Sequence, residues 1–250
     1  MIWRTALLYA QLWLVLSLVS GDLTSDEKTQ IVNLLNQYRS SVNPGAANMQ
    51  RMLWNDKLSE VAAAYAAQCV WDHNPKIEGI LGESTYMTLG PLLVSHPFSV
   101  WFDQHVNYNF YLNNCIAGKP CGDYTQMVWA NTSFVGCAAQ YCPSVSKFDA
   151  ENATMLVCNY YPPGSIKGQS PYKEGPPCTA CPKETQRCTN NYCDRGTDIP
   201  IGLTDASLAT IFNTSPTATS GGFTKPSSVP LLLAGLTVFY SFIPGTFTES

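Results

Sequence analysis

Ten cysteines are the residues of this 250-residue chain whose type and spacing allow the widest choice of chemistry. A cysteine thiolate can attack a substrate, bind a metal or form a disulfide, and the compartment of the protein helps to decide between these roles. Six cysteines lie in the body of the chain, at Cys69, Cys115, Cys121, Cys137, Cys142 and Cys158. The other four lie close together further along the chain, at Cys178, Cys181, Cys188 and Cys193.

The N-terminus predicts an oxidising compartment for these cysteines. Arg4 precedes an apolar stretch over residues 5–19, and the small residues Ser20 and Gly21 follow it. This layout is typical of a secretory signal peptide, here residues 1–20, and the stretch is too short to cross the ~30 Å hydrocarbon layer of a membrane comfortably. We therefore expect an extracellular protein, secreted or attached to the outer face of the plasma membrane, with its cysteines paired in disulfides.

The compact cysteine group could also be a zinc site. Cys178-x-x-Cys181 and the two cysteines that follow could supply four thiolates. The second pair is spaced more widely than in a typical zinc ribbon, and secretion does not favour reduced thiolates. We expect two disulfides in this group, although spacing alone leaves three pairings open.

The C-terminal residues 229–250 predict a membrane attachment signal. Ser220, Gly221 and Gly222 are consecutive small residues, residues 223–229 form a mostly polar spacer, and residues 230–243 form an apolar tail. This order is typical of a glycosylphosphatidylinositol signal with Ser220 as the attachment site. The alternative is a single-pass anchor, but the tail is shorter than the ~20 residues that a spanning helix needs.

Residues 196–228 precede this signal and are rich in serine and threonine, which favours a flexible, O-glycosylated stalk. Three asparagines meet the pattern for N-glycosylation and should lie on accessible loops: Asn131, Asn152 and Asn213.

Motifs for catalysis are missing from the sequence. It contains neither the Gly-x-Ser-x-Gly elbow of hydrolases nor the His-Glu-x-x-His pair of zinc peptidases. Oxidised cysteines provide no thiolate nucleophile. The net charge of -4 provides no basic surface for nucleic acid. We therefore expect a protein that is not an enzyme and does not bind nucleic acid.

The elements that position these residues follow from the hydrophobic pattern. Thr24 and Glu27 form a capping box ahead of an apolar-periodic run over residues 31–42, and a second helical pattern covers residues 56–69. A further helical region lies between Pro91 and Tyr108. Short segments rich in aromatic and β-branched residues predict strands at residues 124–129, 134–141 and 155–160. Helices packed on a small sheet form an α/β sandwich.

Several stretches resemble the CAP family, which comprises the cysteine-rich secretory, antigen 5 and pathogenesis-related 1 proteins. They are Gln68-Cys-Val-Trp-Asp-His-Asn74, Asp123-Tyr-Thr-Gln-Met-Val-Trp129, Leu156-Val-Cys-Asn-Tyr160 and Pro171-Tyr-Lys-Glu-Gly-Pro-Pro-Cys178. They are most similar to the peptidase inhibitor and glioma pathogenesis-related branches. The resemblance implies an α-β-α sandwich over residues 22–168 and a cysteine-rich hinge over residues 169–195. It also implies that Cys178 pairs with Cys188 and Cys181 with Cys193.

The resemblance implies a cleft lined by two histidines and two glutamates, which hold a divalent metal in several relatives. In this chain the matching residues are His73, Glu83, Gln104 and Asp123, so two of the four positions differ. A neutral glutamine amide is a weak zinc ligand, and aspartate has a shorter arm than histidine. Calcium or magnesium prefers more carboxylates than this cleft contains. We therefore expect no metal and no other cofactor in this degenerate cleft.

Sterol binding in other relatives involves an aromatic loop, which Tyr108, Phe110 and Tyr111 resemble, although the three rings could equally be core. The expected function is binding of an extracellular protein partner, such as a protease, or of an apolar small molecule such as a sterol. The alternative is a metal-dependent hydrolase that uses the modified cleft. His73 and Glu83 could form a general acid and base pair for it, but a single pair of this kind is more often a structural hydrogen bond.

Overall fold

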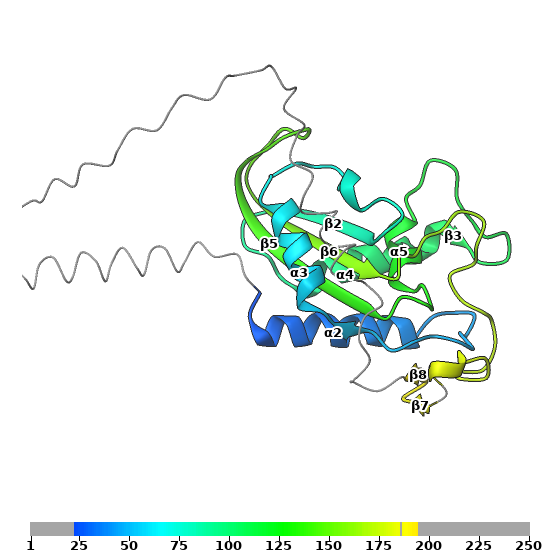
Figure 1. The fold of residues 1–250 in the computed structure, drawn as a ribbon. Coiled ribbons are helices and arrows are strands. Elements are labelled where there is room, and N and C mark those ends of the chain that lie inside the picture. The colour runs from blue at the N-terminus through cyan, green and yellow to red at the C-terminus, as the bar shows by residue number, and fades with distance from the viewer. Residues whose placement is uncertain (1–22, 186, 195–250) are drawn as a thin grey trace, which may run out of the picture. The chain divides into compact units, whose positions relative to one another are not determined.

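The computed structural model of the chain describes residues 23–185 and 187–194 (Figure 1). The predicted signal peptide, stalk and anchor signal, with Asn213 and Ser220, lie outside the described residues. Within the described part of the chain, no helix is both long and apolar enough to cross a membrane.

A four-stranded sheet forms the centre of the fold, with the strand order β1-β5-β6-β2. The central strands β5 (Phe134–Val145) and β6 (Ala150–Tyr161) form a long antiparallel hairpin. The short strand β1 (Leu53–Trp54) pairs in parallel with β5 at one edge. At the other edge, β2 (Gly82–Leu89) runs antiparallel to β6. The sequence prediction placed β5 and β6 correctly but too short, and it did not include β2.

Helices cover both faces of this sheet, as the predicted sandwich requires (Figure 1). On one face, α3 (Asp56–Ala66) packs Ala62, Tyr65 and Ala66 against Ala138 of β5 and Val157 of β6. The approach is closest at Gly136 of β5, where an added Cβ atom would lie 2.2 Å from the backbone nitrogen of Ser59. Any larger residue at this position would push the helix away from the sheet.

The main core lies on the opposite face, under three helices: α2 (Ser25–Ser40), α4 (Ser95–Asp103) and α5 (Gly122–Met127). The remaining elements are short. They are the 3-10 turns η1 (Pro75–Ile77), η2 (Gln104–Asn107) and η3 (Lys183–Thr185), the hairpin of β3 (Tyr108–Asn109) and β4 (Asn114–Cys115), and the hairpin of β7 (Arg187–Thr189) and β8 (Tyr192–Asp194).

Helix ends follow local chemistry. The capping box predicted at Thr24 is present, because its hydroxyl accepts from the amide of Glu27 and its own amide donates to the Glu27 carboxylate. The second helix ends at Ala66, three residues before the predicted end, because Cys69 adopts a left-handed backbone with φ of 52°.

One predicted element is wrong. Residues 124–129 were expected to form a strand, but Gly122–Met127 form helix α5. Tyr124, Thr125, Gln126 and Met127 are all buried, so the segment shows no alternation of buried and exposed positions. Periodicity cannot distinguish a short, fully buried strand from a buried helical turn, and tertiary contacts then decide the conformation.

One such set of contacts comes from Arg39, which is 1% exposed near the end of α2. Its guanidinium donates to five backbone carbonyls, those of Gln50, Met127, Trp129, Ala130 and Thr132. Burial lowers the pKa of Arg39 to about 9, which still leaves the group charged at neutral pH. The arginine therefore connects α2 to the end of α5 and to the loop that enters β5.

Five disulfides join all ten cysteines, so the described residues contain no free thiol. Three lie in the sandwich and join Cys69 to Cys142, Cys115 to Cys121 and Cys137 to Cys158. The other two join Cys178 to Cys188 and Cys181 to Cys193, which is the pairing that the family resemblance implies.

The cysteine-rich hinge packs on the sandwich along residues 45–51. The amide of Ala180 donates to the carbonyl of Ala47 at 2.9 Å, and the amide of Cys193 donates to the carbonyl of Met49 at 2.8 Å. The hydroxyl of Tyr192 donates to the carbonyl of Asn36 in α2, so the hairpin of β7 and β8 lies beside that helix (Figure 1). The hinge and the sandwich thus share a hydrogen-bonded boundary.

Candidate functional site

A cleft of about 350 Å³ lies where β2 begins, beside α5. Three of the four residues predicted for it, His73, Glu83 and Asp123, line its wall. The fourth, Gln104 of η2, contacts the cleft through Asp123. The full lining consists of His73, Gly82, Glu83, Pro120, Gly122, Asp123, Gln126, Gly164 and Ser165.

His73 and Glu83 form the first pair of side chains in the cleft. Nδ1 of His73 lies 3.0 Å from Oε1 of Glu83, and the backbone amide of Asn74 donates to the same oxygen at 2.9 Å. The hydrogen bond to Glu83 raises the pKa of His73, and burial opposes this effect. The imidazole is 70% exposed, whereas the carboxylate side chain is only 4% exposed.

Gln104 and Asp123 form the second pair. Nε2 of Gln104 donates to Oδ2 of Asp123 at 2.8 Å, and the backbone amide of Asp123 donates to Oε1 of Gln104 at 3.2 Å. Burial raises the pKa of the Asp123 carboxyl group, and the bond from Gln104 partly offsets that increase. The two positions that differ from the family pattern are therefore bonded to each other.

The buried carboxylate of Glu83 is only half satisfied. Its Oε1 accepts two hydrogen bonds, but its Oε2 is buried and has no partner within the described protein. Opposite it in the β2–β6 register, the amide group of Asn159 also has no partner. Buried polar atoms are rarely left without partners, and here one amide donor and two acceptor oxygens are unpaired beside the cleft.

Gln126 fixes the wall of the cleft, and the sequence analysis did not identify it. Its Oε1 accepts from the amide of Gly164 at 2.8 Å, and its Nε2 donates to Oγ1 of Thr132 at 3.3 Å. An added Cβ atom on Gly82 would lie 1.9 Å from that same Oε1, so a larger residue there would displace the Gln126 side chain. The one available signal was a glutamine ahead of the apolar residues Met127, Val128 and Trp129.

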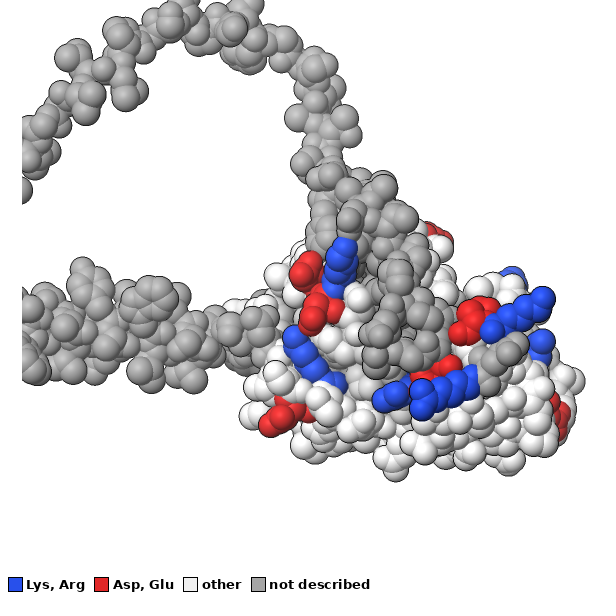
Figure 2. Space-filling model, turned by 60° about the horizontal axis from the view of Figure 1, so that its bottom comes forward, with Lys and Arg blue, Asp and Glu red and all other residues white. Residues whose placement is uncertain are grey.

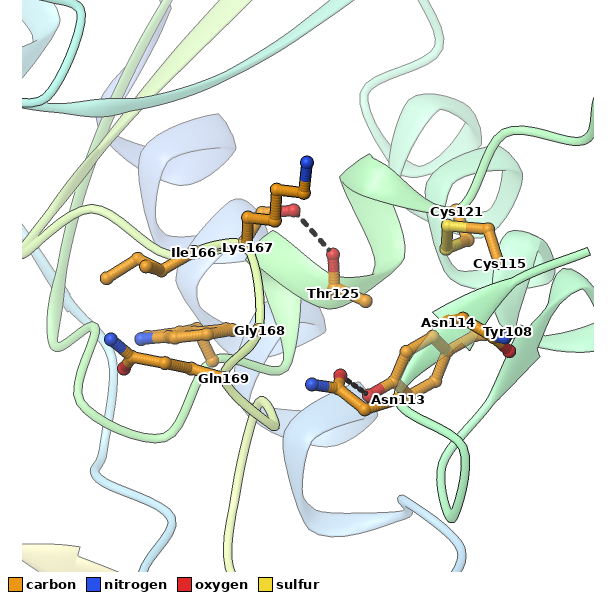
Figure 3. Close-up of a pocket in the computed structure, with 12 residues that line it drawn as sticks. Tyr108, Asn113, Asn114, Cys115, Cys121, Thr125, Ile166, Lys167, Gly168 and Gln169 are labelled. Atoms are coloured by element: carbon orange, nitrogen blue, oxygen red, sulfur yellow. Dashed lines mark hydrogen bonds between the residues drawn. A yellow bond between two sulfur atoms is a disulfide. The ribbon is translucent and has the colours of Figure 1, made fainter.

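A second pocket of about 310 Å³ adjoins the cleft and shares Ser165 with it. Figure 3 shows Tyr108 and Asn113 on one side of this pocket and residues 166–169 on the other, with Thr125 between them. The hydroxyl of Tyr108 donates to Asn113 at 2.7 Å, and the hydroxyls of Thr125 and Ser165 lie 2.8 Å apart. The disulfide between Cys115 and Cys121 closes one end.

The three aromatic residues proposed for lipid binding have different surroundings, although the rings of Phe110 and Tyr111 contact each other with centroids 5.7 Å apart. Tyr108 lines the second pocket, whereas Phe110 stacks on Tyr172 with ring centroids 4.8 Å apart and packs against the main core. Tyr111 is 76% exposed at the tip of the hairpin. The described geometry therefore does not bring the three rings into one cavity.

Two of the predicted glycosylation sites are described, and both are exposed. Asn131 lies in a turn as expected, whereas Asn152 lies in strand β6 and not on a loop. Charged side chains of both signs lie next to one another on the face shown in Figure 2.

The chain belongs to the CAP family. The family model described as the cysteine-rich secretory protein family matches residues 32–160. Peptidase inhibitor 15 of Xenopus laevis is 37% identical over 187 residues, which cover 70% of this chain and 72% of that protein.

Peptidase inhibitor 16 of Bos taurus is 43% identical over 176 residues, which cover 70% of this chain but only 38% of that protein. The fold matches the crystal structure of NaASP2 with Zn²⁺, with a TM-score of 0.51 and 24% identity over 64% of this chain and 90% of that one.

The cleft residues can be tested for their fit to a metal ion from their chemistry and geometry. Within residues 23–185 and 187–194, only one group of three or more His, Cys, Asp or Glu side chains has its ligand atoms within 4.8 Å of one another. This group consists of Cys178, Cys181 and Cys193. These three are in disulfides. In the cleft, Glu83 occupies one nitrogen of His73, and Gln104 occupies one oxygen of Asp123. The donor set of this cleft does not fit zinc, which needs four convergent ligands.

Proposed function

We propose that this CAP protein is not an enzyme and that it acts outside the cell, secreted or at the cell surface, by binding a protein partner along the groove formed by the cleft and the second pocket. The observation that carries this proposal is the mutual pairing of the cleft side chains, His73 with Glu83 and Gln104 with Asp123. Side chains that are already bonded to each other form a fixed surface for recognition.

The groove suits binding better than hydrolysis. Among its described lining residues there is no cysteine thiol, because Cys115 and Cys121 are in a disulfide. The hydroxyl of Ser165 lies against Thr125, and no hydrogen bond joins it to His73. A hydroxyl nucleophile needs a base within hydrogen-bond reach. The names of the relatives suggest that peptidases are one class of partner to test.

A site-specific photo-crosslinking experiment tests this function. A photoreactive residue replaces Ile166, which is 42% exposed at the rim of the second pocket, and a control replaces Phe148, which is 51% exposed at the β5–β6 turn. We expect the groove position to crosslink a protein from extracellular fluid, and excess unlabelled protein to compete with it. Identical crosslinks from both positions, or turnover of a peptide or ester substrate by the purified protein, would contradict the proposal.

A further inference from the structure

The charge of the cleft indicates what kind of group it accepts. Its lining contains the carboxyl groups of Glu83 and Asp123 and the imidazole of His73, but no lysine or arginine among the described residues. The two carboxyl groups outnumber the single imidazole, and a concave site with an excess of acidic groups attracts cations. The complementary group is therefore a cation.

The buried carboxylate provides a second, independent argument. The Glu83 side chain is 4% exposed, and its Oε2 has no hydrogen-bond partner while Oε1 has two. A buried carboxylate oxygen in this state is stabilised by an additional donor or by a nearby positive charge. A positive charge in the cleft need not touch Oε2 to have this effect, because the attraction acts across a few ångströms of protein.

An organic cation fits this arrangement better than a metal ion. Zinc requires ligand atoms that converge on one point, and the cleft residues do not converge in this way. An ammonium group has three donors and a guanidinium group has five, so either can reach carboxylates that are further apart. Lysine and arginine side chains carry these groups.

The second pocket extends the cleft in a way that suits a polypeptide. The two cavities meet at Ser165, and the second is lined by carboxamide side chains, by the rings of Tyr108 and Trp129 and by one cationic side chain, Lys167. Carboxamides can donate to and accept from a peptide main chain, and the rings can pack against an apolar side chain. The disulfide and the hydrogen bonds described above hold these walls in place, which reduces the entropy cost of binding.

We propose that the cleft binds a lysine or arginine side chain from an extended segment of the protein partner, and that the segment continues into the second pocket. This inference rests on the proposed function and specifies the chemistry of the partner. Nothing in it requires a metal or a chemical step.

Calorimetric titration of the mature protein from expressing cells tests this inference with three probes. They are the peptide acetyl-Ala-Ala-Lys-Leu-Ala-Ala-amide, the same peptide with norleucine in place of lysine, and n-butylamine. We expect the lysine peptide to bind about tenfold more tightly than either other probe. Equal affinity for the lysine and norleucine peptides would overturn the assignment of the cation site. Equal affinity for n-butylamine and the lysine peptide would overturn the part of the proposal that concerns a polypeptide.

Charge-removing variants locate the site. We expect Glu83→Gln and, separately, Asp123→Asn to weaken binding of the lysine peptide about tenfold, because each removes one negative charge. Glu151→Gln changes an exposed carboxylate on β6 and should leave the affinity unchanged. Thermal unfolding confirms that each variant is folded, and unchanged affinity in a folded Asp123→Asn protein would contradict the inference. Loss of the lysine preference together with successful crosslinking at the groove would reject this inference and leave the proposed function standing.

Discussion

Asp123 is the residue that changes most in character relative to the family pattern, because a carboxyl group stands where a histidine is usual. Burial raises its pKa above the ordinary value of 3.8, and the bond from Gln104 only partly offsets this. The charged form is therefore less favourable in the folded protein than in the unfolded chain. The stability of the protein depends on pH through this group.

The first prediction concerns the direction in which stability changes with pH through Asp123. A group with a raised folded pKa contributes stability that is fully present below its unfolded pKa and is lost as pH rises through its folded pKa. The variant Asp123→Asn has no such loss and can keep a hydrogen bond from Gln104. We expect the melting temperature of the variant to exceed that of the unmodified protein by a few degrees at neutral pH, and the difference to shrink toward pH 4.

Melting curves at several pH values between 4 and 7 measure this difference. Asp149→Asn, at an exposed position, is the matched control. Its melting temperature should differ from that of the unmodified protein by the same amount at every pH. The pKa of His73 is also raised, mainly by its hydrogen bond to Glu83, and this residue is present in both proteins. If the difference in melting temperature between Asp123→Asn and the unmodified protein is constant with pH, or reverses, burial does not destabilise the charged form of Asp123.

At the scale of elements, α5 holds its place because Arg39 binds the carbonyls that follow it. Replacing Arg39 with Met removes a donor from five backbone carbonyls, of which those of Trp129 and Ala130 keep a backbone amide donor. We expect Arg39→Met to reduce the free energy of unfolding by roughly 4 kcal/mol, measured by denaturant titration.

The control for this variant is Arg51→Met. Arg51 is 42% exposed and forms a single 3.5 Å ion pair with the buried Asp194, so its loss should cost clearly less than the loss of Arg39. Similar costs for the two variants would mean that the buried arginine does not organise this region.

Local patterns in the sequence predicted some elements well and others poorly. The capping box at Thr24 depends only on neighbouring residues, so the sequence was sufficient to locate α2. The β5–β6 strands were recognised from their aromatic and β-branched content. Helix α5 was misassigned because its conformation depends on Arg39, which lies far away in sequence.

The candidate site was predictable in its members but not in its contacts. The family resemblance identified His73, Glu83, Gln104 and Asp123, and the structure brings them to one cleft. The bond between Gln104 and Asp123 forms because η2 and α5 lie against each other in the fold. The role of Gln126 likewise depends on where α5 lies. No spacing in the sequence encodes those contacts.

At the scale of the whole molecule, the hinge stabilises the sandwich through its boundary with residues 45–51. The disulfide between Cys181 and Cys193 holds β8, whose Cys193 exchanges backbone hydrogen bonds with Met49 and Arg51. We expect the double variant Cys181→Ser with Cys193→Ser to lose about 3 kcal/mol of stability.

Differential scanning calorimetry checks this prediction, and the unmodified protein should unfold in a single transition that includes the hinge. A double variant that melts at the same temperature as the unmodified protein would show that the hinge is independent of the sandwich. A separate transition for the hinge would lead to the same conclusion.

The central claim is that the cleft is paired within itself and has lost the ligand set for zinc. Calorimetric titration of the purified protein with zinc tests it most directly, alongside the double variant Gln104→Glu with Asp123→His. This variant has a glutamate in place of Gln104 and a histidine in place of Asp123. The cleft then contains a second pair of the same type as Glu83 and His73. We predict no stoichiometric zinc binding by the unmodified protein and at least about tenfold tighter binding by the variant. Tight stoichiometric zinc binding by the unmodified protein, or no gain in the variant, would contradict the account.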